Sequence, residues 1–488
     1  MELEMFLQLK SLTSLYLSSN RLSLLSNFSV NNSSLKFQTL RLGSCNLKSF
    51  PDFLRYQDQL YELDLSSNNI SSQIPGWFLN INENSLQILN LSHNLLTGFD
   101  QQPVVLPWTS LSSLDLSFNK FQGPLPPLPI SPMSTMRYYL VSNNNLSGEL
   151  SPWICKLNAL RALDLSYNSL HGKLPQCLGN FSYQLSMLNL QSNKFSGSIS
   201  QTIMNGIKLR MIDLSNNMLG GKIPRSLANC TRLEFLDLGN NKIGDTFPSW
   251  IGNLPNLVVL NLHSNELYGA IENPKPDFEF PKLQIIDLSH NRFTGKLPSK
   301  YFECWNTMKV VNASQLAYMM KSTTGSDVYH YSLRMVNKGI EIEYVKISNM
   351  LVSISLANNR FEGEISPSIS ILQGLRYLNL SNNNLVGSIP SSLANLTVLE
   401  SLDLFSNGLS GEIPPQLVKL TPLAFFNVSY NNFIGPIQHG AQFDTFDNMS
   451  YEGNLRLCGP PLSRKCGNSK LPKKEDNEGS ESSFAFGK

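Results

Sequence analysis

The sequence is poor in cysteine, in charge and in long apolar runs. Seven cysteines in 488 residues are too few for a disulfide framework over this length. Charged residues make up 15% of the chain and the formal net charge is +2, with no concentrated basic face, which argues against a nucleic-acid partner. No run of about 18 or more apolar residues occurs, so we expect no membrane-spanning segment in this sequence.

Catalytic signatures are also missing. The sequence contains no H-E-x-x-H, no G-x-S-x-G, no P-loop and no kinase motif. Among the six histidines, His93 and His290 stand at the same place in a repeating pattern, as substitutions of a variable surface residue. We therefore expect a protein that is not an enzyme and that uses no cofactor or metal.

The sequence is instead dominated by a repeat, which is most regular in LRYLNLSNNNLVGSIPSSLANLTV (375–398). Leu375, Leu378 and Leu380 fall where a short strand turns apolar side chains to one side. Asn383 stands where the chain leaves the strand, and an inward asparagine there can satisfy backbone groups that a turn would bury unpaired. One unit cannot bury its own leucines, but stacked units can, because each covers the apolar face of its neighbour.

The turn asparagine recurs about every 24 residues and marks each unit. In one unit Cys45 takes its place, which this type of repeat allows. The turn asparagines are Asn20, Asn68, Asn94, Asn119, Asn144, Asn168, Asn193, Asn217, Asn241, Asn265, Asn291, Asn359, Asn383, Asn407 and Asn431. With Cys45 they mark about sixteen units, so the sequence predicts a leucine-rich repeat solenoid of the α/β horseshoe class with a parallel inner sheet.

The step from Asn291 to Asn359 is longer than the others by about 44 residues. We place this insertion at 304–346, and its run Ile340–Val345 alternates apolar and acidic residues as an exposed strand does. A long loop inside a regular array is costly to order, and loops on a rigid scaffold commonly bind. We favour contact with a ligand or partner over a spacer that only adjusts curvature.

The remaining boundaries follow from the repeat. Repeats 1–12 occupy 1–303 and repeats 13–16 occupy 347–440. The repeat stops at 441–467, where Cys458 and Cys466 bracket a proline turn and predict a disulfide-pinned cap whose phenylalanines cover the last coil. Residues 468–488 are polar and charged and are expected to form a disordered linker.

The other cysteines are interpreted one by one. Cys45 and Cys230 stand at repeat positions that face inward, so we expect buried thiols. Cys155 and Cys177 lie on the return paths of adjacent coils and are candidates for a disulfide. Cys304 is expected to pack beside Trp305.

Two further sets of residues occur along the chain. One is acidic, and because the repeat supplies it once per coil, we assign it a structural or solubility role rather than a catalytic one. It consists of Asp64, Asp115, Asp164, Asp213, Asp237, Asp287 and Asp403. The other is a set of N-x-S/T sequons, which favours a secreted or luminal glycoprotein. Their asparagines are Asn27, Asn31, Asn32, Asn69, Asn90, Asn145, Asn180, Asn229, Asn312, Asn379, Asn395, Asn427 and Asn448.

The ends of the sequence depart from what an extracellular array usually has. The start MELEMFLQLK is not a signal peptide and runs directly into the first repeat. Such arrays normally carry a cap over the first coil. We therefore interpret the sequence as a truncated product or fragment of a longer secreted or membrane-anchored protein.

The sequence resembles the leucine-rich-repeat receptor-like proteins of plants, the class that includes the tomato Cf and Verticillium-wilt resistance proteins. The resemblance rests on the Gly-x-Ile-Pro segments, on YFECWNTM and NKGIEIEYVKI at the ends of the insertion, on four repeats after it, and on the closing SYEGNLRLCGPPLSRKC. It implies a right-handed superhelix with a second short sheet, and an insertion that this family calls the island domain. It also implies a parent protein at the extracellular face of the plasma membrane, with one membrane helix and no kinase.

The resemblance further implies two contacts, both in defence or developmental signalling. The island and the nearby inner surface would bind an extracellular protein or peptide, and the last four repeats would meet a receptor-kinase co-receptor. Residues that differ most from the repeat average, with four from the island, are our candidates. For the ligand they are Arg137, Tyr138, Arg161, Arg210, Glu234, Phe235, Tyr329, Tyr331, Lys338 and Tyr344. For the co-receptor they are Arg376, Tyr377, Phe405 and Phe425.

Three alternatives remain open at this point. The ragged repeat at 124–144 is either tolerated drift or a local contact surface made by Arg137 and Tyr138. The whole chain could be a secreted leucine-rich-repeat inhibitor of a cell-wall-degrading enzyme, although such inhibitors are shorter arrays without an island. It could also be a decoy or nonfunctional truncated receptor.

Overall fold

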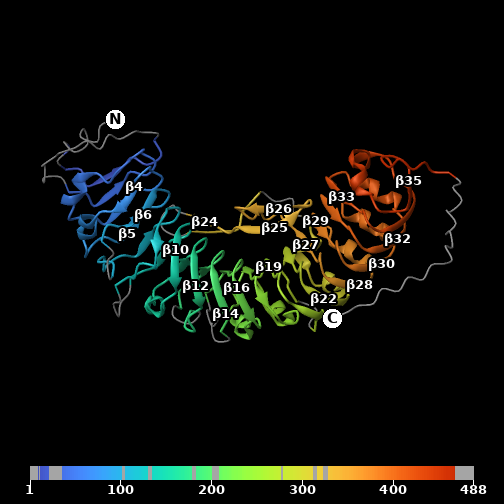
Figure 1. Cartoon of the computed structure of the whole chain (residues 1–488), viewed down its shortest axis with the longest axis horizontal. Coiled ribbons are helices and arrows are strands. Elements are labelled where there is room, and N and C mark those ends of the chain that lie inside the picture. Colours follow the sequence, from blue (N-terminus) through green and yellow to red (C-terminus); the bar gives the residue numbers. More distant parts are fainter. Residues whose placement is uncertain are drawn as a thin grey trace, which may run out of the picture.

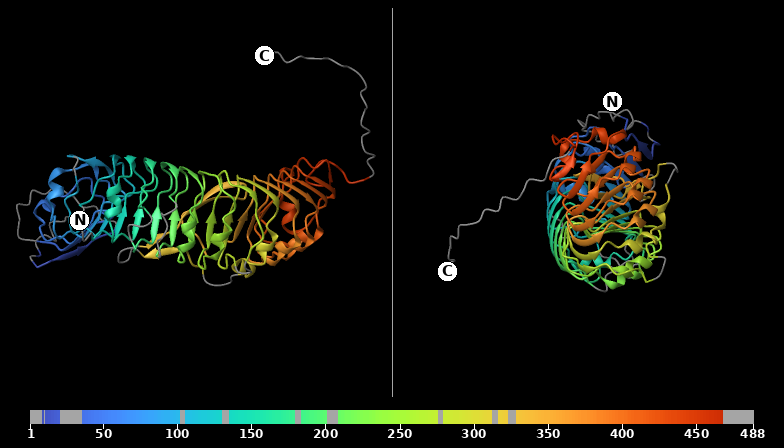
Figure 2. Two further views of the ribbon diagram at one scale, coloured as in Figure 1. Left: turned by 90° about the horizontal axis from the view of Figure 1, so that it is seen from below. Right: turned by 90° about the vertical axis from the view of Figure 1, so that its right-hand side faces the viewer.

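The structure is a computed structural model, and it describes residues 9, 11–20, 36–101, 105–129, 135–178, 183–200, 208–275, 279–311, 316–322 and 328–467. These residues form a curved array of stacked coils (Figure 1). Seen from below, the coils lie side by side along the long axis of the molecule (Figure 2). Each coil contributes one short strand to a continuous parallel sheet.

This inner sheet has 16 strands, as the repeat count predicts. They are β1 (Ser14–Tyr16), β2 (Thr39–Arg41), β3 (Glu62–Asp64), β5 (Ile88–Asn90), β7 (Ser113–Asp115), β9 (Tyr138–Leu140), β11 (Ala162–Asp164), β13 (Met187–Asn189), β15 (Met211–Asp213), β17 (Phe235–Asp237), β19 (Val259–Asn261), β21 (Ile285–Asp287), β27 (Ser353–Ser355), β29 (Tyr377–Asn379), β31 (Ser401–Asp403) and β33 (Phe425–Asn427). The pairing of β21 with β27 carries the sheet across the insertion without a change of register.

The turn asparagine satisfies the backbone as expected. Asn383 donates from Nδ2 to the carbonyl of Leu356 in the preceding coil at 3.0 Å and to that of Leu380 in its own coil at 3.2 Å. Its Oδ1 accepts from the backbone N–H of Phe361 at 3.0 Å. The residue before it, Asn382, has a φ of 50°. This left-handed turn recurs before the other turn asparagines and redirects the chain at the end of each strand.

A second set of short parallel strands lies beyond the turns, in three separate sheets. The first holds β4 (Ser71–Ile74) and β6 (Leu95–Phe99), and the second holds β8 (Gln122–Gly123), β10 (Asn145–Glu149), β12 (Ser169–Lys173), β14 (Lys194–Ser198), β16 (Met218–Gly221) and β18 (Lys242–Ile243). The third holds β20 (Tyr268–Ala270), β22 (Arg292–Lys296), β28 (Arg360–Glu364), β30 (Asn384–Gly387), β32 (Gly408–Glu412), β34 (Asn432–Pro436) and β35 (Arg456–Cys458).

Short 3₁₀ helices complete the return paths. They are η1 (Asp52–Tyr56), η2 (Gly76–Asn80), η3 (Pro152–Lys156), η4 (Arg225–Asn229), η5 (Ser249–Asn253), η6 (Asn306–Lys309), η7 (Pro367–Ile371), η8 (Ser391–Asn395), η9 (Pro415–Lys419), η10 (Ala441–Thr445) and η11 (Asn448–Ser450). The helical turn α2 (Ser299–Phe302) precedes η6. Leucines from strands and return paths form one core that extends along the whole array. Each coil buries its leucines only against its neighbours, as the repeat requires.

The insertion folds back into the inside of the curve (Figure 1). It contains two antiparallel hairpins, β23 (Met320–Ser322) with β24 (Val328–His330), and β25 (Leu333–Asn337) with β26 (Ile340–Tyr344). The strand expected over Ile340–Val345 is therefore confirmed as β26. We call residues 316–351 the island.

The island starts later in the chain than the expected boundary at Cys304. Cys304, Trp305 and Met308 are buried in the core of the solenoid, and the N–H of Gly374 donates to the carbonyl of Met308 at 2.8 Å. These residues therefore complete the return path of the twelfth repeat. At the other end, Ile347 and Leu351 pack with the island rather than with the solenoid core.

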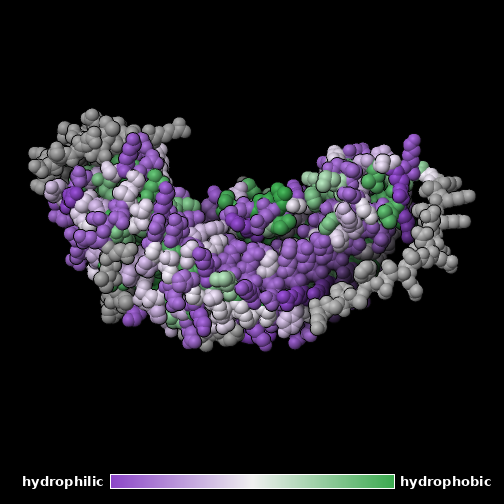
Figure 3. Space-filling model, in the orientation of Figure 1, coloured by the Kyte–Doolittle hydropathy of each residue, from purple (hydrophilic) through white to green (hydrophobic). Residues whose placement is uncertain are grey.

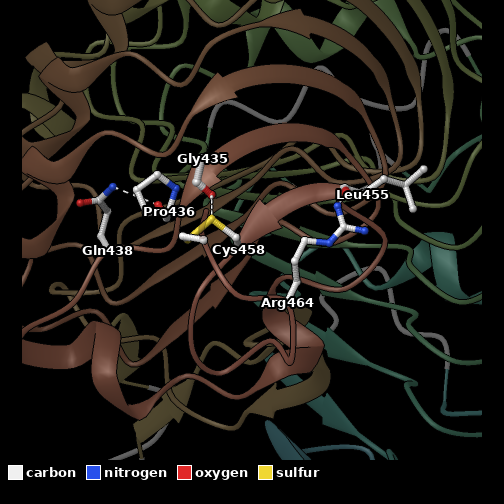
Figure 4. The surroundings of a disulfide bond; sticks show 7 residues. Gly435, Pro436, Gln438, Leu455, Cys458 and Arg464 are labelled. Atoms are coloured by element: carbon white, nitrogen blue, oxygen red, sulfur yellow. Dashed lines mark hydrogen bonds between the residues drawn. A yellow bond between two sulfur atoms is a disulfide. The ribbon is translucent and has the colours of Figure 1, made fainter. Parts of the chain in front are cut away.

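The cap closes the last coil as predicted. The rings of Phe443 and Phe446 lie 5.0 and 5.6 Å from that of Phe426 in β33. Cys458 and Cys466 form a disulfide, and the Cys458 sulfur lies 3.4 Å from the carbonyl oxygen of Gly435 in β34 (Figure 4). The linker expected over 468–488 lies outside the described residues.

Candidate functional site

The island is held to the inner sheet by an apolar column. In seven consecutive strands, β9 to β21, the residue just before the central strand leucine or isoleucine (a tyrosine in β9) is apolar and buried. These residues are Tyr138, Ala162, Met187, Met211, Phe235, Val259 and Ile285, and the island contributes Tyr331, Leu333, Met335, Ile347 and Leu351 to the same cluster. We call this the docking column. It is a second hydrophobic core, separate from that of the solenoid.

The docking column corrects three of the expected contact residues. Phe235 and Tyr331 were expected at an exposed surface, but both are 0% exposed and their rings pack 5.9 Å apart. Tyr138 is likewise buried, at 7% exposed. The expectation that they are exposed anchors is wrong: the island covers the strand positions of Tyr138 and Phe235, and Tyr331 is the island side chain that packs against Phe235.

The sequence held a signal for this that the repeat pattern alone did not reveal. The same strand position carries a serine at Ser113 before the column and at Ser353 after it. Between them it is apolar in every repeat, although it faces away from the solenoid core. A run of apolar residues at an outward position indicates a surface covered by another part of the chain.

Tyr329 fixes the end of the island nearest the first repeats. Its hydroxyl donates to Asp164 Oδ2 at 3.2 Å and accepts from Asn189 Nδ2 at 2.9 Å. Asp164 also accepts from the backbone N–H and the hydroxyl of Ser166. Burial raises the pKa of the Asp164 carboxyl, and these hydrogen bonds oppose that rise. Burial likewise raises the pKa of the Tyr329 phenol.

Glu400, a residue of the solenoid, fixes the other end of the island, where it faces the tip of the β25–β26 hairpin. It accepts from Arg376 Nη1 at 2.7 Å and from the Tyr377 hydroxyl at 3.0 Å, and Lys338 Nζ from the hairpin lies 3.5 Å away. Burial alone would raise the pKa of Glu400, but these donors lower it below its ordinary value. Arg376 and Tyr377, expected to meet a co-receptor, thus contact Lys338 of the island through one carboxylate. We call these four residues the tip latch.

Other predicted residues lie around the latch. Tyr344 accepts at its hydroxyl from Asn337 Nδ2 at 2.7 Å, which braces the hairpin. Phe425 is half-buried against the hairpin turn, where a Cβ added to Gly339 would lie 3.3 Å from its ring. Phe405 is half-buried and packs edge-on to Tyr430 at 5.5 Å.

The remaining predicted ligand residues lie on one flank of the inner sheet. Arg137 and Arg161 are exposed there, one residue before the docking column in consecutive repeats. Arg210 and Glu234 occupy the same flank and form an ion pair with each other at 2.5 Å. Arg137 and Arg161 are therefore accessible beside the island, whereas Arg210 and Glu234 pair with each other.

A groove of about 900 Å³ opens where the island ends, on the inner face of repeats 4 to 8. Its floor consists of strands β5 to β13 and its far wall is the island. The lining includes Asn90, His93, Asp115, Phe118, Tyr138, Leu140, Asp164, Tyr167, Gln191, Tyr329, His330, Glu343 and Lys346. His93 and Phe118 stack with ring centroids 4.2 Å apart and form one side. Burial lowers the pKa of His93, which favours its neutral form.

The acidic column has the structural role that was expected. Asp115 Oδ1 accepts from the backbone N–H of Ser117 at 2.9 Å, and Asp213 makes the same bond to Ser215. In β29 an asparagine stands in place of the aspartate, and Asn379 Oδ1 accepts the same hydrogen bond from the backbone N–H of Ser381 at 3.0 Å. Under the island, burial raises the pKa of Asp213 to about 7 and that of Asp237 well above its ordinary value.

The cysteine predictions are confirmed where the structure tests them. Cys155 and Cys177 form a disulfide between adjacent return paths. Cys45 and Cys230 are buried thiols, and Cys45 Sγ lies 3.5 Å from the carbonyl of Leu17 in the place of a turn asparagine. Cys304 is buried in the same region of the core as Trp305.

The sequons divide into two groups by their place in the coil. The asparagines of five lie exposed on the turns and return paths: Asn69, Asn145, Asn229, Asn395 and Asn448. Those of three lie half-buried in inner strands: Asn90, Asn379 and Asn427. Asn27, Asn31, Asn32, Asn180 and Asn312 lie outside the described residues.

The island also carries exposed apolar side chains on its outer side. Val336, Ile340 and Val345 are 36, 62 and 68% exposed. Figure 3 shows apolar residues gathered over this hairpin inside the curve. Among the residues that the structure describes, no helix is long and apolar enough to cross a membrane, and no group of three or more histidine, cysteine or acidic side chains could hold a metal ion.

Models of the leucine rich repeat match the chain at 59–81, 110–131, 159–181, 183–243, 282–304 and 349–409, and a model of two such repeats matches 231–275. Three Arabidopsis thaliana relatives are receptor-like proteins 49, 47 and 7, which are 48, 47 and 47% identical to this chain over 90, 90 and 100% of its length. The chain covers 50, 54 and 50% of these relatives, about half of their length.

Two solved structures of plant receptors are similar in fold. The Arabidopsis receptor kinase HAESA, in complex with the peptide hormone IDA and the co-receptor SERK1, superposes with a TM-score of 0.68 at 27% identity, over 94% of this chain and 72% of that one. The plant peptide hormone receptor RGFR1, in complex with RGF2, gives a TM-score of 0.62 at 25% identity, over 87 and 70% of the two chains.

Proposed function

Because the chain belongs to the leucine-rich-repeat receptor-like proteins of plants, we propose that it is the extracellular, non-catalytic recognition module of such a receptor. It binds a protein or peptide ligand in the groove between repeats 4 to 8 and the island. It meets a receptor-kinase co-receptor through its last repeats, in defence or developmental signalling. The relatives support the receptor assignment, and the peptide-bound structures support the class of ligand.

One observation carries the proposal. The island packs on the docking column from β9 to β21, so most of the middle of the inner surface is not accessible to a partner. The groove is what remains open beside it, and it combines aromatic walls with a polar floor, the composition of a recognition site. The tip latch ties the same island to repeats 14 and 15. A ligand at one end of the island and a co-receptor near its other end would thus both contact the same rigid part of the chain.

The test blocks the groove after the protein has folded. His93 is exposed at the groove edge, so the His93→Cys variant can be labelled with a bulky maleimide, while the buried Cys45, Cys230 and Cys304 do not react. The matched control is Ser19→Cys, because Ser19 is exposed at the same place of the first repeat.

Random seven-residue peptides displayed on phage are selected on the unlabelled chain. The proposal expects peptides whose binding is lost when the His93→Cys variant is labelled and kept when the Ser19→Cys variant is labelled. A selection without any such peptide would contradict the proposal.

A further inference from the structure

The repeat gathers basic side chains on one flank of the inner sheet, at the start of its strands. The residues just before the docking column form a row in which each backbone N–H, from Arg161 onward, donates to the carbonyl of the member before it. This first row consists of Arg137, Arg161, Ser186, Arg210, Glu234, Val258 and Gln284. Two residues earlier in repeats 8 to 12, a second row consists of Gln184, Lys208, Arg232, Asn256 and Lys282. We call the two rows the basic flank.

The charges of the basic flank do not balance. Its single carboxylate, Glu234, is already paired with Arg210 at 2.5 Å. Lys208 Nζ and Lys282 Nζ donate to the neutral amides of Gln184 and Asn256 at 2.6 and 2.8 Å. The cations of the flank are Arg137, Arg161, Lys208, Arg210, Arg232 and Lys282. The expectation that no face concentrates basic residues is therefore wrong for this flank, because the repeat brings together side chains that lie far apart in the sequence.

Arg137 and Arg161 form an open pair of cations at one end of the flank. Both are exposed, and their strands β9 and β11 are neighbours, so their backbones lie about 4.8 Å apart. Within the part of the chain that the structure describes, neither guanidinium forms an ion pair. Two guanidinium groups side by side repel each other, and a carboxylate that accepts from both relieves this repulsion.

An exposed aromatic ring stands in the same line. Tyr183 is 75% exposed and comes directly before Gln184, in the repeat between those of Arg161 and Lys208. No other tyrosine of the described residues is as exposed. Such a ring offers an apolar face to the flat side of a sugar ring and a hydroxyl to the polar groups around it. The flank thus combines a line of cations with a surface on which a sugar can stack.

We infer that the basic flank binds an acidic polysaccharide, a polymer of a hexuronic acid. Such a polymer carries one carboxylate on each ring, and its rings follow one another in line as the coils do. The cations bind its carboxylates and Tyr183 stacks on one ring. An extended acidic peptide fits less well, because its side chains on one face recur about every 6.8 Å, whereas the coils recur about every 4.8 Å. The flank is separate from the groove, so this inference goes beyond the proposed function and does not depend on it.

Binding of a short oligomer of galacturonic acid to the intact chain tests the inference. N-glycans are first removed enzymatically, because the sequons of Asn180 and Asn229 lie close in sequence to Tyr183 and Arg232. The matched ligand is the same oligomer with its carboxyls methyl-esterified, which keeps the sugar and removes the charge. We expect the acidic oligomer to bind, the ester not to bind, and added salt to weaken the binding.

The variant Arg137→Gln/Arg161→Gln is expected to weaken binding about tenfold or more, because each arginine supplies charge-assisted hydrogen bonds. Its matched control is Arg360→Gln/Arg456→Gln, which removes two exposed arginines from β28 and β35 and should leave binding unchanged. Tyr183→Ala should also weaken binding, whereas Tyr183→Phe should keep it, because phenylalanine retains the face of the ring. All of these side chains are exposed, so the variants are expected to fold.

Three results would overturn the inference. The first is no binding of the acidic oligomer, or equal affinity of the wild type and the Arg137→Gln/Arg161→Gln variant. The second is equal affinity of the wild type and Tyr183→Ala, because the sugar ring would then not be recognised. The third is equally tight binding of polyglutamate or of a single-stranded oligonucleotide of the same charge, because the flank would then bind an acidic peptide or any polyanion. None of these results bears on peptides selected on the groove, so the proposed function would stand.

Discussion

The hydroxyl of Tyr329 lies 3.2 Å from the carboxylate of Asp164, although 165 residues separate them in the chain. This contact joins the island to the seventh repeat and stands at the edge of the groove. Each end of the island is thus tied to the solenoid by a polar contact, with the apolar docking column between them.

Tyr329→Phe is expected to loosen the near end of the island. The change leaves Asn189 and the buried Asp164 without this partner, a loss of about 1–2 kcal/mol. Hydrogen–deuterium exchange should become about tenfold faster at the amides of 328–332, because about 1.4 kcal/mol corresponds to a factor of ten. Tyr183→Phe, at a tyrosine that is 75% exposed, is the control. Unchanged exchange in Tyr329→Phe would show that the contact does not hold the island.

Glu400→Gln should loosen the far end instead. The variant keeps the shape of the side chain but removes the charge that Arg376 and Lys338 share. Because these groups are partly exposed, we expect a cost of only about 1 kcal/mol. The faster exchange should be confined to the amides of 336–341, and salt should reduce the difference from wild type. Glu412→Gln, in β32 on the side of the solenoid away from the island, serves for comparison, and equal effects of the two variants would contradict the latch.

The buried carboxylates predict a dependence of stability on pH. The pKa of Asp213 is about 7 in the folded state because of burial, against about 3.9 for an aspartate in an unfolded chain. Between these values the folded state binds more protons, so stability is greatest at the acidic end and falls as the pH rises toward 7. Asp164 and Asp237, whose pKa values are also raised, act in the same direction.

Asp213→Ser isolates this contribution. The variant cannot carry the charge, so its advantage over wild type in melting temperature should grow from about pH 4.5 to about pH 7.5. Asp164 and Asp237 remain, so the slope should be reduced rather than abolished. Glu362→Gln, at an exposed side chain, is the control and should change the melting temperature by the same amount at both ends of this pH range. An advantage of Asp213→Ser that is constant with pH would contradict the assignment.

Glycan occupancy should follow the two groups of sequons. Asn90 lines the groove, and its Oδ1 accepts from the N–H and hydroxyl of Ser92 at 3.0 and 2.7 Å. A glycan there would fill the site, so we expect Asn90 to be unmodified in protein secreted from plant cells. Exposed Asn69 and Asn145 should carry glycans. Mass spectrometry of the glycopeptides measures this directly, and full occupancy of Asn90 would argue against an open groove.

Much of the fold could be predicted because the same pattern of strand leucines and turn asparagine occurs in all sixteen units. Asn383 and its counterparts show where each strand ends, and the repeat places Cys155 and Cys177 on adjacent return paths, where they form a disulfide. The position of the island could not be derived in this way, because its contacts are not periodic. By sequence alone Phe235 is typical of an exposed anchor, but in the structure Tyr331 covers it. Likewise the link between Lys338 and Glu400 joins segments that no spacing rule connects.

The central claim is that the island docks on the inner sheet and leaves the groove as the open surface. Hydroxyl-radical footprinting of the intact protein tests it without any mutation, because oxidation reports the exposure of individual side chains. We predict that Tyr331, Met211 and Met335 resist oxidation, since they are 0, 0 and 3% exposed, whereas Phe118 and Tyr183, at 47 and 75%, are modified. Oxidation of Tyr331 and Met211 at the rate of Tyr183 would mean that the island stands away from the sheet, and the account would be wrong.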